Sequence, residues 1–511
     1  MNRKSVSSRK SKKVTNKENN AKVQVEFSQI DELKSEIREM RLKHGPMHAK
    51  TLTLMNDLAL ALRDIGKSSE AVQLYEEVHH GCKKALGEFH PYTLSSMSNL
   101  ANMLFELDRL DQAKPLLVET LQRQSQMRGE KHLDTLQTAH NLALLLEEQG
   151  NLDEAEPLYI RAYEGQKSQL GAMNPVVMQT AVNLAGLKQA RGHLEEAEAL
   201  DREALAGCRE VLGDENAQTL QSGNCLARLL HEQGMLQEAE ELLKEVLQGR
   251  LALLGETDPA TLTSLNNLGG LYYTWGRWSE AEPHFFAALE GRKAVLGPLH
   301  PDTLQSANNL ASLFQARGRL DKAKPLFREA LEGRRQVFGD LHPETLTSCS
   351  NLASLLHLLN QLDEADELMN TALAGRRKVL GELHKDTLTS MNNLAGLLRT
   401  QAKHREAERL YEEALAGRKE LLGVGHMDTL MTANNYGLGF RVLAGLRTQL
   451  GDKHPDTLTG ANNLAVLLYS REEYTQAAEL FQEVLNGRRA QPGASEGWGT
   501  STRTRRRRRG I

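Results

Sequence analysis

Residues 300–339 read HPDTLQSANNLASLFQARGRLDKAKPLFREALEGRRQVFG, and this stretch decides the fold. It holds one unit of a pattern that returns every 42 residues and is marked by a threonine-leucine pair. The pairs begin at Thr51, Thr93, Thr135, Thr219, Thr261, Thr303, Thr345, Thr387 and Thr429, and Val177-Met178 fills the missing slot. A period of this length is typical of solenoids, because one unit cannot bury its own apolar face. The sequence therefore predicts a long interaction surface rather than a closed active-site pocket.

Each repeat is predicted to form two helices. We count positions from the threonine as position 0. Apolar residues recur at positions 1, 4, 7, 8 and 11, which is helical spacing along one face. Glycine is frequent at position 15, alanine marks position 20 of a second helix, and glycine at position 36 ends that helix. His-Pro at positions 39 and 40, as in His300-Pro301, then begins the next first helix.

Small residues at positions 8 and 20, a large residue at 24 and alanine at 27 resemble the tetratricopeptide repeat. Residues 300–339 and the segment HPDTLTGANNLAVLLYSREEYTQAAELFQEVL (454–485) are similar to kinesin light chain repeats in particular. The resemblance covers residues 47–490. It implies an all-α, right-handed superhelical solenoid of tetratricopeptide-type helix pairs, with about 22 helices. It also implies a non-catalytic scaffold that binds extended peptide segments in a concave groove and tethers cargo to a microtubule motor.

The repeat pattern divides the chain into six segments. The interval from Thr429 to Thr457 is 28 residues, so 14 residues of one repeat are missing. Because Gly437 and Gly439 flank this junction, we expect a bend or weak point there rather than one smooth helix. The predicted segments are a basic disordered tail (1–23), a capping helix (24–46), nine repeats (47–428), a truncated repeat (429–456), a final repeat (457–490) and an Arg-rich disordered tail (491–511).

Composition limits the function classes. The net charge of −4 combines an acidic repeat region with two basic tails, so nucleic acid could contact only the tails. The four cysteines, Cys82, Cys208, Cys225 and Cys349, lack disulfide or zinc spacing. They favour a cytoplasmic protein with reduced thiols, and the resemblance adds association with the cytoskeleton. No apolar run approaches the length that membrane insertion requires.

An asparagine ladder is the strongest candidate for function. Position 6 is asparagine in nine of eleven units, and position 5 often adds a second one. In tetratricopeptide superhelices the first helices line the concave face, where an amide can both donate to and accept from a peptide backbone. The alternative is that one asparagine per pair bridges to the neighbouring helix. The predicted peptide-binding residues are Asn99, Asn141, Asn183, Asn224, Asn266, Asn267, Asn308, Asn309, Asn351, Asn392 and Asn393, with Arg228, Tyr273 and Arg399.

Two further columns of residues are predicted to be structural. Arginines at position 31 follow a glycine near the end of the second helix, where a cation suits the helix dipole. They are Arg250, Arg292, Arg334, Arg376, Arg418 and Arg488. Histidines at position 39 are expected to cap helices and not to bind metal, since successive loops stand about 10 Å apart. No Walker A or nucleophile-elbow sequence is present, so the chain is predicted not to be an enzyme and to need no cofactor.

The predicted partners are proteins or peptides, with kinesin heavy chain or motor cargo as specific candidates, and no small-molecule substrate. One feature departs from the kinesin light chain pattern: residues 25–45 are too few for the long coiled coil that docks on the heavy chain. Two other interpretations therefore remain open. One is a free adaptor in signalling or ciliary assembly. The other is the regulatory repeat arm of a larger signalling ATPase.

Overall fold

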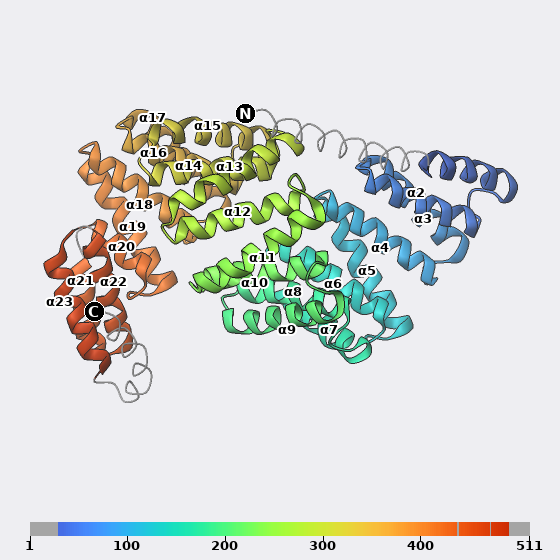
Figure 1. The fold of residues 1–511 in the computed structure, drawn as a ribbon, viewed down its shortest axis with the longest axis horizontal. Coiled ribbons are helices and arrows are strands. Elements are labelled where there is room, and N and C mark those ends of the chain that lie inside the picture. Colours follow the sequence, from blue (N-terminus) through green and yellow to red (C-terminus); the bar gives the residue numbers. More distant parts are fainter. Residues whose placement is uncertain (1–28, 437–438, 471, 490–511) are drawn as a thin grey trace, which may run out of the picture. The chain divides into compact units, whose positions relative to one another are not determined.

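The computed structural model describes residues 29–436, 439–470 and 472–489, and both predicted tails lie outside them. Over this part of the chain every regular element is a helix, and the helices follow one another as packed antiparallel pairs (Figure 1). The prediction of an all-α tetratricopeptide solenoid is confirmed. The helices fall into two compact units that divide between Leu253 and Leu254, and each unit is described by itself.

Each of the nine complete repeats contributes a first helix of 16 residues and a second helix of 18 or 19 residues. A helix over residues 29–44 precedes the repeats, and its Ile30 and Ile37 are buried in the core of the first unit. The repeat helices of that unit are α2 (Ala49–Asp64), α3 (Ser68–Leu86), α4 (Pro91–Glu106), α5 (Leu110–Arg128), α6 (Leu133–Glu148), α7 (Leu152–Leu170), α8 (Pro175–Ala190), α9 (Leu194–Leu212), α10 (Ala217–Glu232) and α11 (Leu236–Leu254).

The second unit continues the same alternation, with even-numbered first helices and odd-numbered second helices. Its last four helices belong to the truncated and final repeats. The helices are α12 (Pro259–Thr274), α13 (Trp278–Val295), α14 (Pro301–Ala316), α15 (Leu320–Phe338), α16 (Pro343–Leu358), α17 (Leu362–Leu380), α18 (Lys385–Thr400), α19 (His404–Leu422), α20 (Met427–Asn435), α21 (Gly439–Leu450), α22 (Pro455–Ser470) and α23 (Tyr474–Arg489).

The junction before α14 explains why the marker residues recur. Gly297 adopts a φ of 90°, a conformation that glycine tolerates at a helix end. His300 then caps α14, because its Nδ1 accepts a 3.2 Å hydrogen bond from the backbone N–H of Asp302. Thr303 Oγ1 donates a 2.8 Å hydrogen bond to the Gly297 carbonyl and closes the loop. The same capping occurs at other position-39 histidines, so the predicted role is confirmed at His48, His90, His132, His342, His384 and His426.

Small residues bring the two helices of each repeat together. Ala311 in α14 and Ala323 in α15 are fully buried at the predicted contact positions 8 and 20. A Cβ atom on Gly333 would overlap Leu304 Cδ2, so this glycine lets the leucine pack closely where the first helix crosses the second. Phe327 fills the adjacent volume and is 1% exposed. Interlocking packing of this kind makes each pair one unit of stability.

The truncated repeat forms two short helices, α20 and α21, and residues 437–438 between them are outside the described residues. Its first part keeps the usual junction, because Thr429 Oγ1 donates a 2.8 Å hydrogen bond to the Gly423 carbonyl. Its second part keeps the usual core residue Leu443, which is buried with side chains of α22 and α23. The helix α20 contacts α19, α21 and α22. The missing residues therefore remove the middle of a repeat but keep the ends that pack against its neighbours.

Candidate functional site

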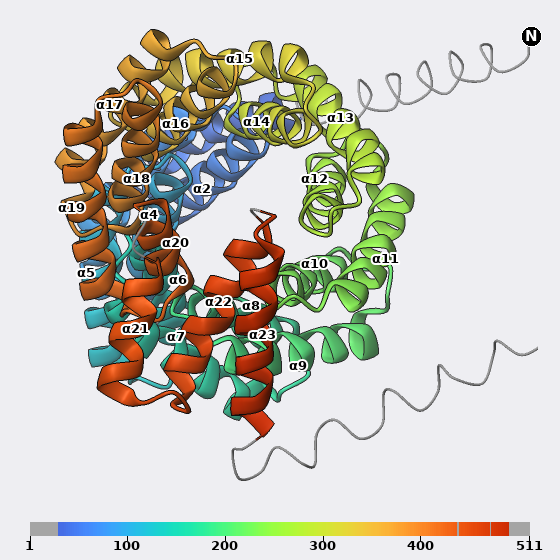
Figure 2. The same ribbon diagram turned by 90° about the vertical axis from the view of Figure 1, so that its left-hand side faces the viewer.

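The candidate site is the face formed by the first helices. Successive first helices contact one another, as α4 does with α6 and α14 does with α16, while each second helix packs mainly on first helices. Within the second unit, Figure 2 shows α12, α14, α16 and α18 on the inner side of α13, α15, α17 and α19. Positions 2, 6, 9 and 12 of the first helices are exposed or half-buried in the nine complete repeats. We call the surface that they form with position 5 the first-helix face.

The asparagines of this face bond to one another across repeats. Asn309 Nδ2 donates a 3.0 Å hydrogen bond to Asn266 Oδ1 in the preceding repeat. Asn351 donates to Asn308 in the same way at 2.9 Å. The same bond joins Asn99 to Asn56 and Asn435 to Asn392. In these four pairs the ladder links position 6 of one repeat to position 5 of the one before, which is the bridging arrangement that sequence analysis left open as an alternative.

Two rungs in the first unit use other partners. Asn141 Nδ2 donates a 3.1 Å hydrogen bond to Asn102 Oδ1, at position 9 of the preceding repeat. Asn183 Nδ2 lies 3.2 Å from His140 Nε2, so a histidine takes the place of the position-5 asparagine. In both cases the position-6 asparagine amide still faces a hydrogen-bond acceptor in the preceding repeat. The requirement at these positions is therefore a hydrogen bond between repeats rather than asparagine itself.

The predicted peptide-binding residues differ in burial: some are buried, some are half-buried and two are exposed. The position-5 residues Asn224, Asn308 and Asn392 are only 7%, 8% and 6% exposed, so their side chains serve chiefly inside the array. Arg228 and Arg399 are exposed. The others are half-buried on the first-helix face: Asn99, Asn141, Asn183, Asn266, Asn267, Asn309, Asn351, Asn393 and Tyr273. This second group and the two arginines are the ones a partner could reach.

The position-31 arginines are buried and join three helices. Arg334 in α15 is 2% exposed, and its Nη1 donates a 2.8 Å hydrogen bond to Ser348 Oγ in the next repeat. Its Nη2 bonds to Gln305 Oε1 in its own first helix and lies 2.6 Å from Glu344 Oε2. Equivalent bonds fix Arg292, Arg376 and Arg418, and the side chain of Arg488 lies outside the described residues. A helix-dipole role alone does not account for this bonding.

Arg334 is connected to the asparagine ladder through hydrogen bonds. Sequence analysis missed this connection. Gln305 accepts from Arg334 and donates a 2.9 Å hydrogen bond from Nε2 to Asn309 Oδ1, and Asn309 then donates to Asn266. The signal was present in the sequence, since a hydrogen-bonding residue stands at position 2 in each repeat that has an arginine at position 31. The result at this repeat is a polar chain from Arg334 through Gln305 and Asn309 to Asn266, which links α15 with the first helices α14 and α12.

Repeat 4 contains an unusual buried carboxyl group. Asp201 occupies position 24, where Tyr159 and Phe285 stand in other repeats, and it is 3% exposed. Its Oδ1 has no hydrogen-bond partner among the described residues. Burial raises the pKa of Asp201 to about 7, although the nearby Arg228 opposes the shift. Burial also lowers the pKa of His140, one repeat earlier, to about 4. Sequence analysis missed both groups, and the loss of the aromatic at position 24 was the available signal.

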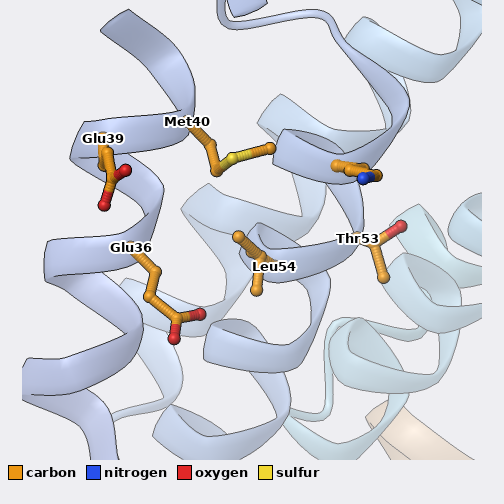
Figure 3. Close-up of a pocket in the computed structure, with 6 residues that line it drawn as sticks. Glu36, Glu39, Met40, Thr53 and Leu54 are labelled. Carbon is orange, nitrogen blue, oxygen red and sulfur yellow. The ribbon is translucent and has the colours of Figure 1, made fainter. Parts of the chain in front are cut away.

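One hollow lies at the start of the array, beside the first helix of the first repeat. Figure 3 shows a pocket of 480 Å³ between the helix at 29–44 and α2, lined by Glu36, Glu39, Met40, Thr53 and Leu54. It combines two carboxylates with Lys50, a threonine hydroxyl and two apolar side chains. Over the described ranges no cluster of His, Cys, Asp or Glu is arranged to hold a metal ion. Within the same ranges no helix has the length and apolar character to cross a bilayer.

Comparison with known protein families identifies the family of this chain. It belongs to the tetratricopeptide repeat family. The matched spans are residues 50–114, 92–168, 176–250, 222–294, 276–336, 302–378, 344–420 and 386–445, and a second family of the same description matches residues 457–490. A comparison with curated proteins finds no match. Proteins built from these repeats are interaction scaffolds, and no catalytic family is indicated.

Several solved structures are similar to this chain. BtubC (BKLC) from P. vanneervenii is 23% identical, with a TM-score of 0.40, over 45% of this chain and 92% of that one. A kinesin light chain-like protein of Podosopora anserina with nearly identical TPR-like repeats is 28% identical, with a TM-score of 0.36, over 40% and 96%. The apo quorum sensor NprR from B. thuringiensis is 15% identical, with a TM-score of 0.50, over 72% and 99%. The NprR match agrees with the fold.

Proposed function

We propose that the first-helix face binds extended peptide segments of partner proteins, in the manner implied by the resemblance to kinesin light chain. The reachable ladder asparagines would contact the peptide backbone, and Arg228, Tyr273 and Arg399 would contact its side chains. Kinesin heavy chain and motor cargo are the partners this resemblance implies. A free signalling or ciliary adaptor would use the same face, and so would the repeat arm of a larger ATPase.

One observation carries the proposal: between α12 and α18 the first-helix face is polar, almost uncharged and built from small residues. Positions 2, 6 and 9 of α14 are Gln305, Asn309 and Ser312. Gly270 occupies position 9 of α12, and a Cβ atom added there would meet nothing within 4 Å. Glycine inside a helix costs about 1 kcal/mol relative to alanine, and packing does not explain it here. A peptide backbone that approaches α12 closely at this position would explain the glycine.

The ladder can hold such a backbone while it bridges repeats. A side-chain amide has two N–H donors and one carbonyl acceptor, and each rung uses one donor of the position-6 asparagine. The second N–H of the half-buried Asn351 can still donate to a peptide carbonyl. Repetition of this group along α12 to α18 would match an extended chain whatever its side chains.

Affinity purification of the full chain followed by mass spectrometry would test the proposal. Recovery of kinesin heavy chain would favour the motor interpretation, and partners without it would favour the free adaptor. Ser312→Tyr with Ser354→Tyr places bulk on the first-helix face, and we expect at least tenfold weaker binding of a recovered partner by calorimetry. Glu332→Tyr, on the exposed side of α15, is the matched control. Full affinity in the double variant would contradict binding at this face.

A further inference from the structure

A row of exposed apolar side chains runs along the ends of the second helices in the second unit. Position 34 lies in the last turn of each second helix, and position 38 lies in the loop that follows. In the second unit the apolar residues at these two positions are between 41% and 49% exposed. The row consists of Val295, Leu299, Val337, Leu341, Val379, Leu383 and Leu421. It lies outside the first-helix face and is not used by the proposed function.

The row is continuous from one repeat to the next. Leu383 Cδ2 lies 3.5 Å from the point where a Cβ on Gly417 would stand, one helical turn before Leu421. In the first unit the equivalent contact is a hydrogen bond from Gln169, at position 34, to the carbonyl of Lys131, at position 38 of the preceding repeat. Position 38 therefore lies beside position 34 of the following repeat, which pairs Leu299 with Val337, Leu341 with Val379 and Leu383 with Leu421. We call the seven side chains the strip.

The fold does not require apolar residues at these positions. Three repeats place Lys131, Glu215 and Thr257 at position 38, and another places Gln169 at position 34, all of them exposed. Single exposed apolar residues are common and need no explanation, but a contiguous apolar patch marks an interaction site. The seven side chains together expose roughly 500 Å² of apolar surface, within the range of such functional patches.

We propose that this strip pairs with the same strip of a second copy of the chain. Its side chains repeat with a fixed spacing along the array, and a second copy supplies a partner with identical spacing. Two-fold pairing would let each residue contact the other strip in reverse order. A stable interface buries about 800 Å² on each partner, so the strip would form the apolar core and its surroundings the polar rim.

The charges beside the strip fit a self-complementary rim. Arg335 Nε lies 3.2 Å from Asp340 Oδ1, and Arg377 Nε lies 2.9 Å from Glu382 Oε2 in the next repeat. The two middle repeats of the strip therefore each offer one cation and one anion, at positions 32 and 37. A copy running in the opposite direction would present these charges in reversed order, so opposite charges can face each other across the interface.

Sedimentation of the full chain would test the proposal. We expect a dimer for the unaltered protein and at least a tenfold higher dissociation constant for Val337→Gln combined with Leu341→Glu. Both replacements occur naturally at the same positions of the first unit, as Gln169 and Glu215, so the helices should fold normally. Circular dichroism melts would check this.

The matched control places the same changes in the first unit, as Val211→Gln combined with Met173→Glu, where polar residues interrupt the row. This variant should remain dimeric. An unaltered protein that sediments as a monomer at all concentrations would overturn the proposal. Equal dissociation of the control, or an unchanged dimer in the Val337/Leu341 variant, would overturn it too.

Discussion

Arg334 Nη1 donates a 2.8 Å hydrogen bond to Ser348 Oγ across the boundary between two repeats. Because the same guanidinium bonds to Gln305 in its own first helix, one buried cation ties a second helix to the first helices on both sides. Stability in a repeat array depends on such nearest-neighbour terms. In this chain a polar network supplies part of the coupling that apolar packing usually provides.

Arg334→Ala should therefore destabilise the array markedly. It leaves Ser348 and Gln305 without a donor in a buried place, and hydrogen bonds to charged groups contribute about 1.5–3 kcal/mol each. Urea unfolding would measure the change in the free energy of unfolding.

The chain offers a milder replacement for comparison. Gln166 occupies the same position in repeat 3 and accepts a 2.8 Å hydrogen bond from Thr180. Arg334→Gln should consequently lose less stability than Arg334→Ala. If the two variants unfold at the same urea concentration, the hydrogen bonds to Ser348 and Gln305 do not account for the contribution of Arg334 to stability.

Removing the ladder acceptors should lower stability. Asn266, Asn308 and Asn392 each accept a hydrogen bond from the next repeat, so replacing all three with alanine removes three bonds of about 0.5–1.5 kcal/mol each. Better helix propensity of alanine offsets part of the loss. Thermal melts should show a lower Tm. An unchanged or higher Tm would mean that the rungs contribute nothing to folding.

Much of the fold could be predicted from the sequence because the repeat is so regular. Helix ends were marked by chemistry that acts locally, such as the capping His300 and the loop-closing Thr303. Contacts between helices were marked by size, as at Ala311 and Ala323. Both kinds of signal depend on residues within one repeat, and a single repeat could be compared with nine others.

The candidate site was harder to predict, since its chemistry depends on contacts between repeats. The bond from Asn351 to Asn308 joins residues 43 positions apart, and no local pattern shows which side of an asparagine faces a neighbour. Burial of Arg334 depends on three helices at once. Asp201 departs from the repeat consensus, and only the side chains packed around it in the fold show that its carboxyl group is held away from water.

Ala323→Trp should be among the most damaging single changes. Ala323 is fully buried where α14 and α15 cross, and a large ring there forces the helices apart at a cost of about 1–3 kcal/mol or more. Glu332→Trp adds the same ring on the exposed side of α15 and should be nearly neutral. Calorimetric melts of both variants test this, and equal Tm values would show that α14 and α15 are not tightly packed at Ala323.

The truncated repeat should open more readily than a complete one. Its helices α20 and α21 have 9 and 12 residues, whereas α16 and α17 have 16 and 19, so fewer contacts hold each end. Local unfolding is easiest where contact density is lowest. Hydrogen exchange should be faster over residues 429–436 and 439–450 than over 345–380. Equal protection would indicate that the shortened repeat couples its neighbours fully.

The last prediction concerns Asp201 and pH. Its pKa of about 7 in the folded state exceeds the ordinary value of 3.8, so the folded state holds a proton that the unfolded state releases between these values. The contribution of Asp201 to stability is therefore fully favourable below pH 4 and declines as pH rises to about 7. Asp201→Asn removes this dependence, and its free energy of unfolding should exceed that of the unaltered chain by up to about 4 kcal/mol at pH 8.

Both proteins retain His140, whose lowered pKa acts in the opposite direction, so its effect cancels in the difference. Urea unfolding at several pH values gives that difference, and Asp111→Asn, at an exposed carboxylate, serves as the control. A constant difference between pH 4 and 8 would mean that Asp201 ionises in the folded state as it does in water.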